Sequence, residues 1–183
     1  MLADIVIHAF DQVEGDLVEA VRVTVEKVFK MKVVLGEKLS VPARSYSRER
    51  AQYLSTDLLD VLATHARGDE RIERIRLGIT NVDLFVPELN FVFGEASSAR
   101  RVAIFSTARL DPVGYGEAKD EAILLRRATT EAVHELGHVF GLGHCSRPGC
   151  VMWFSNTLSE TDRKGSEFCQ RCARQLDTNK LTH

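Results

Sequence analysis

The sequence lacks both an excess of charge of one sign and a long hydrophobic run. It has 24 basic and 26 acidic residues, mixed along 183 positions, and a formal net charge of −2. This balance gives no electrostatic basis for binding nucleic acid or an anionic membrane. The apolar runs are far shorter than the roughly 20 residues that a membrane-spanning helix needs. We therefore expect neither nucleic acid nor a membrane among the partners.

The chain also shows no targeting segment, repeat, low-complexity tract or extended linker. Its first ten residues, MLADIVIHAF, have no basic segment and no long apolar segment of the secretory type. We therefore expect a cytoplasmic protein. A hydrophobic content of 44 % is enough to form a hydrophobic core. We therefore expect one domain over residues 1–183. We also expect a monomer.

Cysteine is scarce, and all four cysteines fall within 28 residues, as Cys145, Cys150, Cys169 and Cys172. Each pair gives two closely spaced thiolates, and two such pairs can complete a tetrahedral zinc shell. Two disulfides are the main alternative, although the N-terminus argues against an oxidising compartment. A redox CxxC is a weaker alternative, because no thioredoxin-like strand and helix surround it.

The most informative segment is HELGHVFGLGH, residues 134–144. On a helix, His134 and His138 lie one turn apart on the same face, so both imidazoles can bind one metal ion. Glu135 lies beside the first of them, angled away from the metal, in the usual place of a general base for an attacking water.

Gly141 and His144 extend this pattern. A glycine can take the left-handed conformation that ends a helix, and such a turn could bring His144 back to the metal. Three imidazoles leave a fourth position open, as catalytic zinc requires. A chance HExxH on an ordinary helix and a purely structural zinc are the alternatives.

The extended motif resembles that of the metzincin metallopeptidases, in which a methionine-containing turn lies under the zinc. Met152 is placed for that turn. Together with the four cysteines, the segment from 134 to 172 resembles the archaemetzincins. The resemblance implies a catalytic zinc on His134, His138 and His144, with Glu135 as the base. It also implies a second, structural zinc on the cysteines Cys145, Cys150, Cys169 and Cys172, hence two zinc ions per chain.

Hydrophobic periodicity predicts the elements before this motif. We expect strands at 4–10, 32–35 and 75–79, the last half-buried, and a hairpin that pairs 90–93 with 102–105 around a turn at 95–101. We expect helices over 13–28, over 51–65 with His65 at its core boundary, and over 117–140. The loop 109–116 reads as an ordinary connector, and a role of its Tyr115 at an oxyanion is a guess.

These elements predict an α/β (α+β) fold with a twisted mixed sheet, a backing helix and an active-site helix, as the metzincin resemblance also implies. Residues 1–144 would form this core, and residues 145–183 a small C-terminal subdomain stapled by zinc. We expect the hairpin to supply an edge strand that binds an extended peptide.

The predicted function is zinc-dependent hydrolysis of a peptide bond in a peptide or protein substrate. Glu135 takes a proton from the attacking water and passes it to the leaving amine. Met152 would form an apolar floor beneath the histidines. The alternatives are a two-zinc module that binds peptides or a partner without cutting, and hydrolysis of a non-peptide amide.

Overall fold

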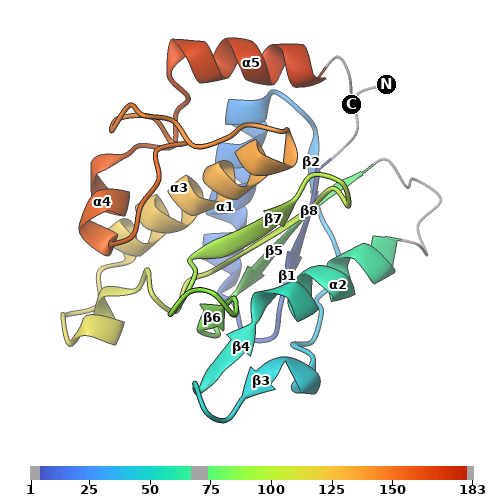
Figure 1. Cartoon of the computed structure of the whole chain (residues 1–183), viewed down its shortest axis with the longest axis vertical. Coiled ribbons are helices and arrows are strands. Elements are labelled where there is room, and N and C mark those ends of the chain that lie inside the picture. The colour runs from blue at the N-terminus through green and yellow to red at the C-terminus, as the bar shows by residue number, and fades with distance from the viewer. Residues whose placement is uncertain (1–4, 67–73, 181–183) are drawn as a thin grey trace.

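The computed structural model describes residues 5–66 and 74–180, and a five-stranded sheet forms its centre (Figure 1). Its strands are β1 (Ile5–Ala9), β2 (Val33–Leu35), β5 (Ile75–Thr80), β7 (Gly94–Ser97) and β8 (Val102–Ser106). Their order is β2-β1-β5-β8-β7. Strands β2, β1, β5 and β8 are parallel to one another, and β7 runs antiparallel to β8. One edge of the sheet is therefore an antiparallel strand, and no described strand pairs with its outer side.

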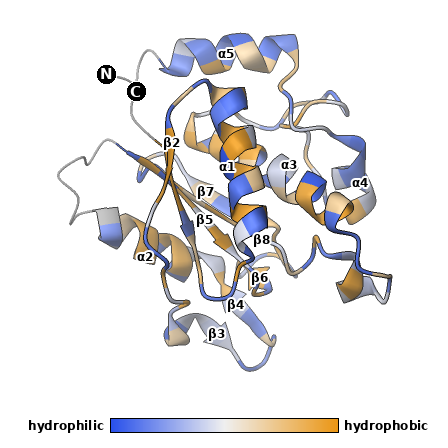
Figure 2. Ribbon diagram, turned by 180° about the vertical axis from the view of Figure 1, so that it is seen from behind, coloured by the Kyte–Doolittle hydropathy of each residue, from blue (hydrophilic) through white to orange (hydrophobic). Residues whose placement is uncertain are grey.

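Helices cover both faces of this sheet. The pair α1 (Gly15–Phe29) and α3 (Glu121–Val139) packs together on one face, and α2 (Ser55–Ala66) packs against β5, β7 and β8 on the other. Along β8, Ala103 and Phe105 belong to the hydrophobic cluster of α1 and α3, whereas Val102 and Ile104 belong to that of α2. In Figure 2, hydrophobic and hydrophilic residues alternate along α1, as expected of a helix with one buried side.

The prediction of a helix over 51–65 is wrong at its start. Residues Gln52–Leu54 form a strand, β4, which pairs with β3 (Tyr46–Ser47) and with β6 (Leu84–Phe85) in a small second sheet. Ala51 has a φ of 53°, a left-handed conformation that breaks a helix. The partner β6 lies about thirty residues further along the chain, so local periodicity carries no signal of this pairing.

Two other predictions about strands need correction. The hairpin partner of β8 is β7 at 94–97 rather than 90–93, with Gly94 opposite Phe105 and Ser97 opposite Val102. Strand β5 is buried along its whole length instead of half-buried, because β1 and β8 flank it and helices cover both faces. The strands predicted at 4–10 and 32–35 correspond to β1 and β2, although residue 4 lies outside the described residues.

The active-site helix begins at Glu121 rather than at 117, because the Asp120 side chain accepts a hydrogen bond from Ile123 N and caps the helix. Two short 3-10 helices, Ala43–Ser45 and Pro112–Tyr115, lie in connections. The C-terminal part contains α4 (Leu158–Arg163) and α5 (Gln170–Lys180).

The sheet and helix arrangement confirms the predicted fold class. Residues of the C-terminal part, among them Val151, Met152 and Leu176, belong to the same hydrophobic cluster as α1 and α3. The division at residue 144 into a core and a subdomain stays a prediction. Among the described residues, no helix is both long and apolar enough to cross a membrane.

Candidate active site

The structure brings His134, His138 and His144 together. One nitrogen of each ring lies within 4.8 Å of the others. His134 and His138 come from consecutive turns of α3, and their Nε2 atoms are 3.1 Å apart. Two nitrogen ligands of one tetrahedral zinc would be separated by about 3.4 Å, given Zn–N bonds of about 2.0–2.1 Å. The spacing therefore fits one shared ion.

Backbone carbonyls fix which nitrogen of these rings carries the proton. His134 Nδ1 lies 2.7 Å from Val151 O, and His138 Nδ1 lies 2.8 Å from Leu142 O. A carbonyl oxygen only accepts, so each Nδ1 donates and each Nε2 keeps its lone pair. The two lone pairs then face each other rather than forming a hydrogen bond. A shared cation stabilises such an arrangement, so the donor set fits a zinc ion.

The turn after α3 positions the third histidine. Gly141 has a φ of 77°, the left-handed conformation expected from the sequence. Its N–H donates to His138 O, and Leu142 N–H donates to Gly137 O, which closes the helix. His144 is exposed, and its ring lies 4.7 Å from that of Phe154. The chain reversal thus carries His144 back beside the rings of α3.

Met152 is fully buried under the same turn of α3. A Cβ added to Gly137 would collide with its sulfur, so the helix backbone lies directly on the Met152 side chain. Met152 O also accepts a hydrogen bond of 2.8 Å from Cys145 N. This geometry matches an apolar floor beneath the histidines.

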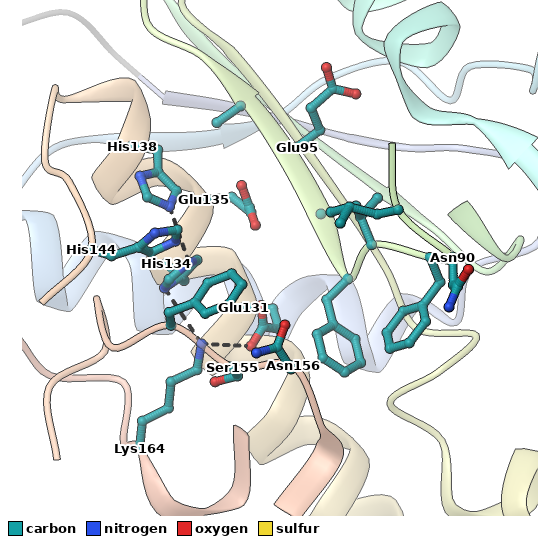
Figure 3. Close-up of a pocket in the computed structure, with 17 residues that line it drawn as sticks. Asn90, Glu95, Glu131, His134, Glu135, His138, His144, Ser155, Asn156 and Lys164 are labelled. Atoms are coloured by element: carbon teal, nitrogen blue, oxygen red, sulfur yellow. Dashed lines mark hydrogen bonds and ion pairs between the residues drawn. The ribbon is translucent and has the colours of Figure 1, made fainter. Parts of the chain in front are cut away.

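Glu135 lies between the histidines and strand β7 (Figure 3). Burial raises the pKa of its carboxyl well above the usual value, and the nearby Glu131 and Glu95 raise it further, while Lys164 opposes the shift. Burial likewise lowers the pKa of His134 well below its usual value. Neutral imidazoles and a more basic carboxylate are the forms that metal binding and proton abstraction require.

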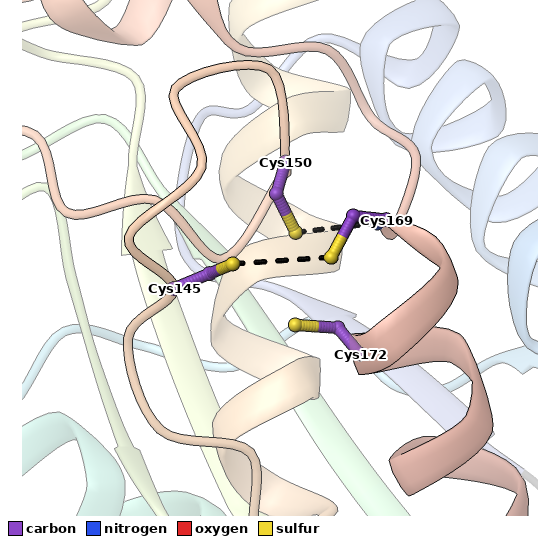
Figure 4. A group of neighbouring side chains, drawn as sticks. All are labelled: Cys145, Cys150, Cys169 and Cys172. Atoms are coloured by element: carbon purple, nitrogen blue, oxygen red, sulfur yellow. Dashed lines mark hydrogen bonds between the residues drawn. The ribbon is translucent and has the colours of Figure 1, made fainter.

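The four cysteines form a second cluster, with one sulfur from each within 4.8 Å of the others (Figure 4). All four are free thiols, and Cys145 Sγ lies 3.9 Å from Cys169 Sγ. A disulfide would need about 2.05 Å. Two sulfurs on one tetrahedral zinc are about 3.8 Å apart, given Zn–S bonds of about 2.3 Å. The sulfur spacing therefore fits a metal site and not a pair of disulfides.

Hydrogen bonds prepare this cluster for a cation. The backbone N–H of Cys172 lowers the pKa of the Cys169 thiol to about 6, whereas burial raises the pKa of the Cys150 and Cys172 thiols. Cys169 N donates to Cys150 Sγ at 3.3 Å, and Arg171 Nη2 lies 3.5 Å from Cys145 Sγ. Because Cys145 directly follows His144, the two clusters are joined through one peptide bond.

A cavity of about 470 Å³ contains the histidines and Glu135. Residues 89–96, which include most of β7, line one side, and the segment 154–156 lines another. Sequence reasoning missed six polar residues of this lining, namely Asn90, Glu95, Glu131, Ser155, Asn156 and Lys164. Glu131 gave a weak local signal, since it lies one helical turn before His134 and Glu135. Nothing in the sequence indicates that Lys164 lies in this cavity.

Two minor predictions have clear outcomes. Tyr115 does not line the cavity, and its hydroxyl donates to Arg109 O at 3.2 Å, so the guess of an oxyanion role was wrong. His65 is half-buried, as predicted, and its ring lies edge-on to that of His8 with centroids 5.0 Å apart.

Residues 2–178 match the profile of peptidase family M54. An archaemetzincin of Pyrococcus horikoshii is 44 % identical over 150 residues, which cover 82 % of this chain and 79 % of that protein.

Solved structures agree with this match. The crystal structure of an archaemetzincin from Methanopyrus kandleri superposes with a TM-score of 0.83 at 39 % identity, covering 99 % of this chain and 96 % of that one. That of a zinc-dependent peptidase from Methanocorpusculum labreanum gives 0.87 at 33 % identity, covering 94 % and 99 %. Each likeness extends over nearly the whole fold.

Proposed function

The chain belongs to peptidase family M54, the archaemetzincins, and is a zinc metallopeptidase; we propose that His134, His138 and His144 hold its catalytic zinc and that Glu135 is the general base. The observation that carries this assignment is the 3.1 Å distance between the Nε2 atoms of His134 and His138. In each ring a backbone carbonyl accepts a hydrogen bond from Nδ1, which leaves Nε2 free to bind a metal. Glu135 lies in the same cavity.

The mechanism follows from the positions of these side chains. Zinc, when bound, supplies a Lewis acid that polarises the scissile carbonyl and acidifies the attacking water. Glu135 accepts the proton of that water, and burial makes its carboxylate more basic by raising the pKa of the carboxyl. The same carboxyl then returns the proton to the leaving amine.

Strand β7 is proposed to hold the substrate. It is an edge strand, it lines the cavity, and the side opposite β8 has no strand partner in the described sheet. An extended peptide can pair with such an edge through backbone hydrogen bonds alone. A peptide bound in this way would have its scissile bond between β7 and the histidines, beside Glu135.

A second, structural zinc on Cys145, Cys150, Cys169 and Cys172 is part of the proposal. The sulfur spacing and the lowered pKa of the Cys169 thiol support it. Four free thiols fit a reducing compartment such as the cytoplasm. All the proposed ligands and the base come from one chain, which supports a monomer as the functional unit.

Zinc content and peptide cleavage together test this assignment. We expect two zinc ions per chain by elemental mass spectrometry, one of them removed by mild chelation together with cleavage of a mixed peptide library. Glu135→Ala should abolish cleavage and keep the zinc content near two. Glu121→Ala, at the exposed start of the same helix, is the matched control and should cleave normally. Unchanged turnover in Glu135→Ala would exclude Glu135 as the base, and two zinc ions without any cleavage would favour a binding module.

A further inference from the structure

One end of the active-site cavity is closed by three polar side chains that the mechanism does not use. Glu131 lies on α3 one turn before His134, Lys164 follows α4, and Ser155 belongs to the segment beside His144. All three line the cavity, and Figure 3 shows Glu131 and Lys164 together on the side of the histidines away from Glu95. We refer to Glu131, Ser155 and Lys164 as the polar base of the cavity.

The charges of the polar base are deeply buried and only partly satisfied. The side chains of Lys164 and Glu131 are 1 % and 3 % exposed, and Lys164 Nζ lies 3.0 Å from Glu131 Oε1. This contact is an ion pair without hydrogen-bond geometry, and Glu131 Oε1 has no hydrogen-bond partner among the described residues. The buried Ser155 Oγ has none either. Unsatisfied buried polar atoms are costly unless something else pairs with them.

Lys164 also keeps donor capacity toward the cavity. Apart from Glu131, its ammonium lies near His134 Nδ1 and Trp153 O, both at 3.5 Å. His134 Nδ1 already donates to Val151 O, so it has no lone pair to accept from Lys164. The polar base therefore offers a donor and an acceptor side by side, with no net charge from the ion pair.

This combination selects among substrate side chains. A carboxylate would be attracted by Lys164 but repelled by Glu131, and a cation would meet the opposite conflict. An aliphatic side chain would leave Ser155 Oγ without a partner and Glu131 Oε1 with only its ion pair to Lys164. Sites with unpaired polar groups reject such substrates strongly. A carboxamide suits Lys164 and Glu131 together, because its oxygen accepts from Lys164 and its NH2 donates to Glu131.

We propose that the polar base binds the carboxamide side chain of an asparagine or glutamine adjacent to the scissile bond. This inference rests on the proposed function, since it places the substrate against the histidines. The remaining walls fit the same side chain, because Phe91, Phe93 and Phe154 offer apolar surface for its methylene groups. The polar base then determines which peptide bonds are cut.

Binding of peptide hydroxamates to the zinc-loaded protein tests this inference without requiring turnover. The probes are one series of hydroxamates that differ only in the side chain next to the zinc-binding group, namely Gln, Glu, Lys and Met. We expect the Gln probe to bind at least about 10-fold more tightly than each of the others by isothermal titration calorimetry. Tighter binding of the Met, Glu or Lys probe, or equal binding of all four, would overturn the proposal. So would failure of every probe to bind.

The double substitution Glu131→Leu with Lys164→Met supplies the second arm. Replacing both charges together avoids leaving one buried and unpaired, and such replacements are often neutral for stability. The Gln preference should fall at least 10-fold, so that the Met probe binds as tightly as the Gln probe or more tightly. Glu19→Gln with Arg22→Gln, which removes the ion pairs of Arg22 with Glu19 and Glu26 on α1, is the control and should leave the ratio unchanged. An unchanged ratio in the Glu131/Lys164 variant would contradict the proposal.

Cleavage of the mixed peptide library separates this inference from the proposed function. Selective binding of the Gln probe with no cleavage of any peptide would support the polar base as a recognition site and count against peptidase activity of this chain. Cleavage without enrichment of Asn or Gln beside the cut bond would support the peptidase and overturn the carboxamide preference.

Discussion

At the residue scale, the approach of β7 to the active-site helix depends on Gly94. A Cβ at this position would lie 2.6 Å from Ile104 O and 2.7 Å from the Glu135 side chain. The first of these neighbours is backbone and cannot move away easily. Gly94 is therefore the point at which the edge strand and the proposed base come close enough to share a substrate.

Gly94→Ala should therefore displace Glu135 and strain the hairpin. We expect a loss of about 1–3 kcal/mol in the free energy of unfolding, typical of overpacking, together with a lower kcat. Denaturant unfolding and peptide cleavage measure the two effects. Gly15→Ala is the control, because no atom lies within 4 Å of the added Cβ. A Gly94→Ala protein with wild-type stability and kcat would show that this close approach is unimportant.

His8 is a buried titratable residue away from the active site. Its Nδ1 lies 2.9 Å from Glu37 O, and its Nε2 has no partner among the described residues. Burial lowers the pKa of His8, and the neighbouring His65 and Arg76 lower it further. The unfolded chain, with an ordinary histidine pKa of about 6.5, therefore binds the proton more readily than the folded chain.

It follows that protonation of His8 destabilises the folded protein below about pH 6.5 and has no effect well above it. We expect the free energy of unfolding to fall between pH 7.5 and pH 5.5, and to fall less in His8→Asn, whose amide can still donate to Glu37 O. Urea unfolding of both zinc-loaded proteins at the two pH values measures the difference, and the histidines of the active site contribute equally to both. Identical pH dependence would exclude His8 as a contributor.

At the element scale, α4 is held to the active-site helix by a shared carboxylate. Arg127 and Arg126 of α3 both contact Asp162 of α4, at 2.8 Å and 2.7 Å. Arg127 is 7 % exposed and also donates to Leu110 O, whereas Arg126 is 48 % exposed. Because Lys164 lies directly beyond α4, this contact also positions the polar base.

Substituting each of these two arginines in turn tests how burial changes the contribution of an ion pair to stability. Arg127→Ala should cost about 2–4 kcal/mol of unfolding free energy, because it removes the donor to a buried carbonyl and leaves the half-buried Asp162 carboxylate with only the exposed Arg126. Arg126→Ala should cost less than about 1 kcal/mol, as exposed ion pairs usually do. Chemical denaturation measures both. Equal costs for the two substitutions would contradict the role given to burial.

Helix α5 is hydrogen-bonded to residues at the C-terminal ends of α1 and α3. Asn179 Nδ2 donates to Phe140 O at 2.6 Å, and Lys180 Nζ donates to Phe29 O at 2.7 Å. The first of these acceptors lies next to Gly141, where the chain turns toward His144. The same helix carries Cys172, so the cysteine cluster and the turn at the active site are linked by one rigid element.

At the scale of the whole molecule, the C-terminal part depends on the cysteine cluster. The helix α5 is mostly hydrophilic and buries only Cys172 and Leu176. Two buried side chains provide little hydrophobic stabilisation for a segment of this length. The binding of a metal to the four thiols would supply the missing free energy, since metal binding to a folded site is folding free energy.

Cys172→Ser should therefore remove one zinc ion per chain and lower the thermal midpoint. A loss of about 4 kcal/mol corresponds to roughly 10 °C in a protein of this size. Cleavage should fall as well, because Cys145 is bonded to His144. Asp177→Ala, on the exposed side of the same helix, is the control for a surface change. A fully folded Cys172→Ser protein with two zinc ions would contradict the structural site.

The sequence by itself determined the family, the two groups of candidate metal-binding side chains and the fold class. These conclusions depend on residues that are close in the chain. The helical spacing of His134 and His138, the turn at Gly141 and the paired cysteines all act within 39 positions. Geometry over so short a span follows from backbone rules that every helix and turn obeys.

Only the tertiary structure decided the remaining features of the cavity. The carbonyls of Val151 and Leu142 that orient the histidines leave no trace in a spacing pattern, because any residue has a carbonyl. Two contacts join segments about thirty or more residues apart, namely the pairing of β4 with β6 and the ion pair of Glu131 with Lys164. The strand that pairs with β8 also begins a few positions later than local periodicity predicts. Such contacts are set by packing of the whole chain, so local periodicity does not contain them.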